Sequence, residues 1–223
     1  MNSYVFKIAG NCLEALPSGA LWWPEQRLMA VADLHLGKAE RLARQGGSLL
    51  PPYETAETLE RLEGVLGACA PRTVILVGDS FDDLGAADAL PDDIAERIAR
   101  MAAGRRWIWI TGNHDPGPVD LPGPHLAEHR VEGLAFRHIA ESGGAPDVSG
   151  HYHPKARLWL RGQSIRRPCF LIDARRVILP AFGTYTGGLR IDDPAFDRIV
   201  ARDAVAVLTG KRAIALPRTA AIA

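Results

Sequence analysis

The chain has 223 residues, of which 47% are hydrophobic and 23% are charged, and this ordinary globular composition excludes disordered and fibrous proteins. Its 26 basic residues equal its 26 acidic residues, which excludes binding of nucleic acid or anionic membrane through bulk positive charge, although not through a local patch or a bound metal. A chain of this length buries roughly 70% of its unfolded surface. We therefore predict a single domain over residues 1–223.

The three cysteines, Cys12, Cys69 and Cys169, lie far apart and cannot all pair, so the sequence offers neither a disulfide scaffold nor a CxxC zinc site. No run approaches the roughly 20 apolar residues of a membrane span, and the first residues lack the pattern of a signal peptide. We therefore expect a protein of the reducing cytoplasm that has no membrane partner.

The first predicted elements are a hairpin and three buried strands. Residues 4–8 and 12–16 flank a short turn and predict the hairpin. Residues 28–32, 73–77 and 107–111 are continuous runs of apolar residues, many of them β-branched or aromatic, which is typical of strands buried on both faces. Each of the three runs ends abruptly in polar residues.

Helical patterns lie between these strands. Apolar residues recur at helical spacing in residues 53–69 and again in residues 91–104, where Gly104 can close the helix. Alternation of strand and helix predicts an α/β fold, in which ligands collect at the carboxyl ends of the strands. The remainder is richer in strand, with segments at 134–137, 148–149, 156–160, 169–173, 177–179 and 204–208.

Side chains that can bind metals follow the predicted strands; four of the seven histidines are candidate ligands, and a fifth, His114, lies among them in the sequence. Imidazole mixed with carboxylate and amide oxygen, without thiolate, suits manganese, iron, zinc or cobalt better than calcium or copper(I). There are too many donors for one ion and enough for two ions that share a carboxylate. The candidate ligands are Asp33, His35, Asp79, Asn113, His138, His151 and His153.

The spacing of these residues suits a pair of ions. Asp33 and His35 are two residues apart, so both side chains can point to one side, and His151 and His153 can do likewise or divide between two ions. Two ions roughly 3.5 to 4 Å apart bridge a water, lower its pKa and clamp the oxygens of a phosphate. The pattern therefore predicts phosphoester hydrolysis by a dimetal-bound hydroxide.

The order of the motifs carries a family resemblance. Asp-x-His at 33–35, Gly-Asp at 78–79, Gly-Asn-His-Asp at 112–115, a lone His138 and Gly-His-x-His at 150–153 together resemble the binuclear metallophosphoesterases, also called calcineurin-like phosphoesterases. The resemblance implies a four-layer α/β/β/α sandwich with two mixed sheets.

The resemblance also implies roles for the site residues. His114 would contact the phosphate and protonate the leaving oxygen instead of binding a metal, and Asp115 would orient His114. The first ion would be held by Asp33, His35, Asp79 and His153. Asp79 would bridge to a second ion, which is completed by Asn113, His138 and His151.

Two further segments, Phe136-Arg137-His138 and residues 180–188, resemble the bacterial ligase-associated DNA-damage-response endonucleases. That branch implies manganese, with zinc or iron as alternatives, and single-stranded DNA as the substrate. It also implies a role in DNA repair and a functional link to an ATP-dependent DNA ligase and a helicase. The branch commonly has Phe-His-Asp where this chain has Phe81-Asp82-Asp83. We infer no lost metal ligand, but we expect the Asp82 charge to repel a phosphodiester.

Several alternatives remain open. The same dimetal site serves a phosphomonoesterase or a cyclic-nucleotide phosphodiesterase, and a non-catalytic scaffold of this fold is a third reading. His125 and His129 are spaced for a zinc pair on a helix, although we favour surface histidines. Arginines at 157–176 fit either solvated strand ends or a groove for phosphates. We favour core or homodimer contacts over base stacking for the tryptophans Trp22, Trp23 and Trp159.

Overall fold

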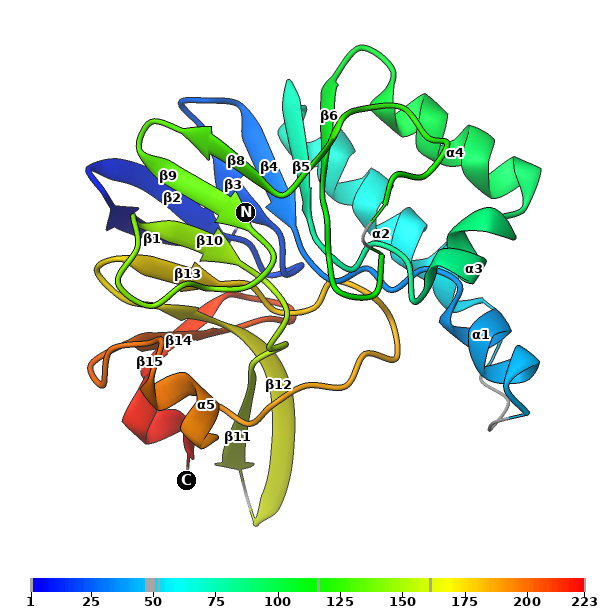
Figure 1. Cartoon of the computed structure of the whole chain (residues 1–223). Helices are drawn as coiled ribbons and strands as arrows, with labels where there is room; N and C mark the ends of the chain where they lie inside the picture. The colour runs from blue at the N-terminus through cyan, green and yellow to red at the C-terminus, as the bar shows by residue number, and fades with distance from the viewer. Residues whose placement is uncertain (1, 47–50, 52, 116, 161, 223) are drawn as a thin grey trace.

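Two mixed β-sheets pack face to face at the centre of the fold, and helices cover their outer faces (Figure 1). The structure is a computed structural model and describes residues 2–46, 51, 53–115, 117–160 and 162–222. The first sheet is antiparallel from its first to its fourth strand and parallel thereafter. Its order is β1 (Tyr4–Ile8), β2 (Asn11–Ala15), β3 (Leu21–Trp23), β4 (Leu28–Val31), β5 (Thr73–Val77), β6 (Arg106–Ile110) and β7 (His125–Leu126).

The second sheet is also mixed, with parallel pairing on both sides of β10 and antiparallel pairing elsewhere. Strand β11 (Lys155–Leu160) lies outside this path and pairs with β12 to form a hairpin. The order is β15 (Ile214–Pro217), β14 (Val205–Leu208), β12 (Gln163–Ile172), β13 (Arg176–Ile178), β10 (Asp147–Ser149), β9 (Leu134–Arg137) and β8 (Glu128–Val131).

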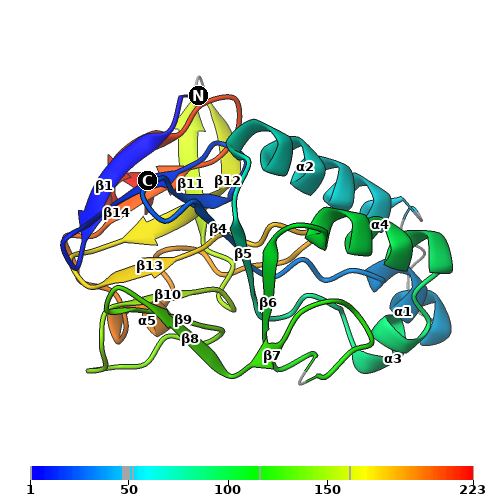
Figure 2. The ribbon, with the colours of Figure 1, turned by 90° about the horizontal axis from the view of Figure 1, so that it is seen from above.

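Helices α2 (Glu54–Cys69) and α4 (Asp92–Ala102) cover the first sheet on the face turned away from the second sheet (Figure 2). Their apolar stripes bury Leu62 and Ile98 against strand residues such as Leu76. The shorter helices α1 (Lys38–Arg44) and α3 (Leu84–Asp88) pack together near the carboxyl ends of β4 and β5. None of the described helices has the length and apolar character needed to cross a membrane.

The core between the sheets joins apolar residues from both of them, including Val77 and Ile108 from the first sheet and Phe136 and Phe170 from the second. The outer face of the second sheet packs on α5 (Pro194–Asp197), whose Phe196 is fully buried, and on the 3₁₀ helix η1 (Arg218–Ile222). The predicted α/β/β/α sandwich with two mixed sheets is confirmed. Its fourth layer is thin, because α5 has four residues.

Candidate metal centre

Polar side chains collect at the edge where the parallel strands β4, β5 and β6 end. Loops that follow β9 and β10 reach the same edge from the second sheet. All seven predicted ligands lie here, because the carboxyl ends of neighbouring parallel strands meet at one place. They form two groups, the first of Asp33, His35 and His153 and the second of Asp79, Asn113, His138 and His151.

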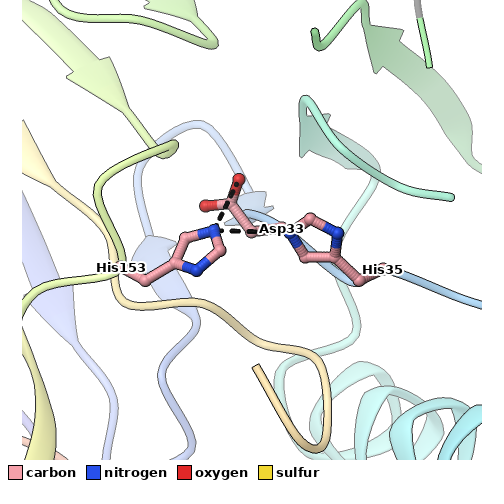
Figure 3. Close-up of side chains that lie close together, drawn as sticks. All are labelled: Asp33, His35 and His153. Atoms are coloured by element: carbon pink, nitrogen blue, oxygen red, sulfur yellow. Dashed lines mark hydrogen bonds and ion pairs between the residues drawn. The ribbon is translucent and has the colours of Figure 1, made fainter. Parts of the chain in front are cut away.

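In the first group the ring of His153 faces both other members (Figure 3). Its Nε2 lies 3.4 Å from Oδ1 of Asp33 and 3.4 Å from Nε2 of His35. The carboxylate of Asp33 is fully buried and accepts hydrogen bonds from the backbone N–H of His151 at 3.0 and 3.1 Å. One carboxylate and two imidazoles therefore present donor atoms to a common point.

In the second group the amide oxygen of Asn113 lies 2.9 Å from Nε2 of His138 and 2.9 Å from Nδ1 of His151. Oδ2 of Asp79 lies 3.3 Å from the same His138 nitrogen. His138 also links the groups, since its Nδ1 lies 3.7 Å from Oδ1 of Asp33. The sharing of Asp79 by two ions stays a prediction, because the contact of its carboxylate with another predicted ligand, His138, is within the second group.

Electrostatics keep the carboxylate of Asp79 anionic. Burial alone raises the pKa of Asp79, but the hydrogen bond and charge of His138 and the backbone N–H of His114 outweigh burial and lower this pKa to about 2. Burial lowers the pKa of His138, and the contacts with Asp79 and Asp33 raise it by more. An anionic carboxylate beside imidazoles is a suitable donor set for a divalent transition metal.

The backbone gives an independent sign of function. Left-handed backbone is uncommon for residues other than glycine and costs of the order of 1–3 kcal/mol at each position, so a cluster of such residues points to a functional site. Five of the seven predicted ligands have it. They are Asp33 (φ 55°), His35 (φ 47°), Asp79 (φ 44°), His151 (φ 70°) and His153 (φ 45°).

Two motif glycines make room for the donors. A Cβ on Gly78 would lie 2.1 Å from Nδ1 of His138, and a Cβ on Gly112 would lie 2.1 Å from Oδ1 of Asp79. Any side chain at either position would push a predicted ligand away. The donor chemistry, the backbone conformation and these close approaches together fit a pair of transition-metal ions.

Asp82 does not act as we expected from the sequence. Its side chain is buried, with Oδ1 2.9 Å from Nδ1 of His35, and it forms ion pairs with Arg41 and, at 3.8 Å, with Lys38. Burial raises the pKa of Asp82, but these three partners outweigh burial and lower it to about 2. Because two cations offset the charge, the expected repulsion of a phosphodiester is not supported. Asp82 instead holds His35 with its Nε2 toward His153.

The predicted orientation of His114 by Asp115 is wrong. The carboxylate of Asp115 accepts backbone hydrogen bonds from Ser80 at 2.7 Å, Phe81 at 3.1 Å and Gly112 at 3.1 Å, and so ties the loop after β5 to the loop after β6. Burial raises the pKa of Asp115 to about 6, and the charge of Asp79 adds to this effect. His114 is oriented by the main-chain oxygen of Asp82, which accepts from Nδ1 at 2.8 Å.

The other histidine pair is not a helical zinc site, because His125 lies on β7 and His129 lies on β8. The ring of His125 stacks on Trp109, with centroids 5.8 Å apart and planes 6° apart. Burial lowers the pKa of both histidines. Their structural environment therefore favours packing roles.

Removing the carboxylate of Asp82 should weaken metal binding. We expect Asp82→Ala to lower the affinity for Mn²⁺ by about 10- to 100-fold, because a ligating imidazole loses the partner that fixes it. Asp82→Asn should lie between this variant and the parent, since its amide oxygen can still face His35. Isothermal titration calorimetry with Mn²⁺ measures the effect.

Asp83→Asn is the matched control. Asp83 caps α3 through the backbone N–H of Ala86, and asparagine caps helices equally well, so this variant removes a neighbouring charge and leaves His35 alone. If Asp82→Ala bound Mn²⁺ as tightly as the parent, or if Asp83→Asn lost as much Mn²⁺ affinity as Asp82→Ala, the proposed role of Asp82 in holding His35 would be contradicted.

A family model described as calcineurin-like phosphoesterase matches residues 26–183, a range that contains every predicted ligand. Among solved structures, the nuclease MPE from Pseudomonas putida is 29% identical, covers 96% of this chain and 100% of its own, and superposes with a TM-score of 0.74. The phosphoesterase Yfce from E. coli is 15% identical, with 85% and 98% coverage and a TM-score of 0.44. No curated protein matches the chain.

Proposed function

The chain belongs to the calcineurin-like phosphoesterase family, and on that premise we propose that it is a manganese-dependent phosphodiesterase that cuts single-stranded DNA as an endonuclease. Membership makes it a phosphoester hydrolase. The choice of a nucleic acid rests on its likeness to the Pseudomonas putida nuclease over the full length of that chain. The observation that carries the proposal is the meeting of two donor groups at one sheet edge beside the imidazole of His114, which belongs to neither group.

We assign Asp33, His35 and His153 to one ion, Asn113, His138 and His151 to the other, and Asp79 to both. Manganese is favoured by the mixture of nitrogen and oxygen donors, and zinc and iron are the alternatives. When bound, two such ions activate a water and neutralise charge on the phosphate.

The chain's own groups hold and protonate the substrate. The exposed ring of His114 has its Nδ1 fixed by the Asp82 carbonyl, so Nε2 is the nitrogen that delivers a proton to the leaving oxygen. A hollow of about 440 Å³ opens beside the second donor group, with Asn113 and His138 in its wall. It gives the substrate room next to these donors.

Model substrates separate the candidate reactions. With Mn²⁺ we expect bis(p-nitrophenyl) phosphate to be hydrolysed at least about 10-fold more efficiently, by kcat/KM, than p-nitrophenyl phosphate, because the proposed substrate is a diester, whose phosphate carries one negative charge where that of the monoester carries two. Circular single-stranded DNA should be converted to linear fragments, which an exonuclease cannot do.

A preference for the monoester would overturn the proposed endonuclease activity and favour a phosphomonoesterase. Cleavage of cyclic nucleotides but not of DNA would favour a cyclic-nucleotide phosphodiesterase. Inactivity on the diester, the monoester, cyclic nucleotides and DNA would favour the non-catalytic scaffold. The free state of Cys12, Cys69 and Cys169 supports a reducing compartment, which we take to be the cytoplasm. We place the enzyme in DNA repair beside an ATP-dependent ligase and a helicase, and genes for both next to its own would support this.

A further inference from the structure

The hairpin of β11 and β12 starts two residues after the predicted ligand His153 and projects beyond the strand ends of the second sheet (Figure 1). Directly paired residues of antiparallel strands share a face. The pairs Lys155 with Pro168, Arg157 with Arg166 and Trp159 with Ser164 therefore define one face of the hairpin, which we call the basic face. Residues on the opposite face, such as Ala156 and Leu158, pack on the apolar cluster around Phe196.

The basic face carries positive charge without acidic neighbours on its own strands. None of its six paired residues is acidic, and among the described residues Lys155, Arg157 and Arg166 form no ion pair with a carboxylate. A chain that is neutral overall therefore has a local positive surface that leads away from the metal centre.

An exposed aromatic ring lies toward the tip of this face. Trp159 is 57% exposed, whereas Trp23 is fully buried and Trp22 packs half-buried against the core. The guanidinium of Arg157 lies 5.1 Å from the centre of the Trp159 indole ring. Cations that follow a backbone, with an aromatic ring on which a base can stack, are the features that proteins use to bind single strands without sequence preference.

A hollow of about 230 Å³ lies at the base of the same face and is lined by Lys155, Pro168, Thr186 and Arg61. The ammonium of Lys155 donates to the main-chain oxygen of Thr186 at 2.8 Å. The guanidinium of Arg61 stacks on Phe182, 4.5 Å from the ring centre. The hollow extends the positive surface toward α2 and has the charge to receive a phosphate.

We propose that the basic face binds the single-stranded DNA that flanks the scissile phosphate, with phosphates on Lys155, Arg157 and Arg166 and a base stacked on Trp159. From Lys155 to Trp159 the strand spans about 13 Å at a rise of about 3.3 Å per residue. This role of the basic face rests on the proposed function, because the face supplies contacts that only a polymeric substrate can use. We expect a small diester such as bis(p-nitrophenyl) phosphate to bind at the metal centre without contacting Arg157, Trp159 or Arg166.

Charge removal tests the phosphate contacts. In the manganese-loaded enzyme we expect Arg157→Gln with Arg166→Gln to lower kcat/KM for a single-stranded oligonucleotide at least about 10-fold, mainly through KM, and to leave bis(p-nitrophenyl) phosphate hydrolysis unchanged. The plot of log kcat/KM against log salt should become shallower by about 1.4, since each lost contact with a single strand removes about 0.7. Arg72→Gln with Arg100→Gln removes the same charge at exposed positions outside the hairpin, before β5 and on α4, and should change neither the hydrolysis of the oligonucleotide nor that of the small diester.

Trp159→Ala and Trp159→Phe test the stacking. We expect alanine to raise KM for the oligonucleotide about 5- to 10-fold and phenylalanine to restore most of the loss, because any aromatic ring can stack on a base. If every hairpin variant cut DNA with the kinetics of the parent, the proposal that the basic face binds DNA would be overturned. An equal loss of kcat/KM in the control pair would overturn it as well. If the parent enzyme hydrolyses the small diester but cuts no single-stranded DNA, the proposed function is wrong, and the DNA-binding role of the basic face is wrong with it.

Discussion

Asp79→Ala should lose at least about 10³-fold in kcat/KM for bis(p-nitrophenyl) phosphate in the presence of Mn²⁺. The carboxylate is 2% exposed, its Oδ2 lies 3.3 Å from Nε2 of His138, and its Oδ1 accepts from the backbone N–H of His114 at 2.9 Å. Alanine removes the donor assigned to both ions and leaves two partners without their acceptor. Steady-state kinetics and the metal content of the purified variant measure the effect.

Asp79→Asn separates loss of charge from loss of shape, because its amide can still accept from His114. We expect it to fold, as judged by circular dichroism and thermal unfolding, yet to bind less Mn²⁺ than the parent. Asp120→Ala, which removes an exposed carboxylate from the loop after β6, should retain parent activity. Full activity in Asp79→Ala would overturn the assignment of the metal centre.

The strands that carry the centre could be predicted because their residues are buried on both faces. Strands β4, β5 and β6 are covered by the second sheet on one side and by helices on the other, so their sequences are continuous apolar runs. Strand β12 was predicted only from residue 169, whereas it begins at Gln163. Its first half is polar because it pairs with β11 and faces solvent, and such a segment lacks the pattern of a buried strand.

The shortest helices and strands could not be predicted, because they are too short to show a periodic pattern of apolar residues. Strand β7 has two residues, and helices α3 and α5 have five and four, which is less than two helical turns. Such segments are held in place by caps and neighbouring loops, as in α3, where Asp83 accepts from the backbone N–H of Ala86. Helix α1 begins after Gly37 with a left-handed backbone and no side-chain cap, so no sequence signal marks its start.

The donor types of the centre were readable from the sequence, but the partners of those donors were not. The contact between Asp82 and His35 joins the loops after β5 and β4, and only the pairing of these strands brings the two residues together. The sequence alone did not indicate which residue pairs with Asp82. It placed Asp115 next to His114 in the chain, which suggested a contact between the two side chains. A carboxylate that follows a histidine in sequence need not face it, and the carboxylate of Asp115 turns to three backbone N–H groups instead.

The hydrogen bond between His114 and the Asp82 carbonyl makes the predicted role of His114 as a proton donor testable. Its Nδ1 donates to the Asp82 carbonyl, which fixes the ring beside His35, with the two ring centres 5.1 Å apart. We expect His114→Ala to keep the parent affinity for Mn²⁺ and to lose about 10²-fold or more in kcat, because the leaving oxygen departs without a proton. The loss should shrink as the leaving group becomes more acidic, so a series of aryl phosphodiesters gives a steeper dependence of log kcat on leaving-group pKa in the variant than in the parent.

His129→Ala, on β8 and outside both donor groups, is the matched control and should keep the parent slope. A role for His114 limited to packing would lower kcat equally for every leaving group, and a role as a metal ligand would lower the Mn²⁺ affinity. Either result would contradict proton donation. Because Asp82 holds His35 through its carboxylate and His114 through its main-chain carbonyl, Asp82→Ala keeps the carbonyl, so it should weaken metal binding without steepening the leaving-group dependence.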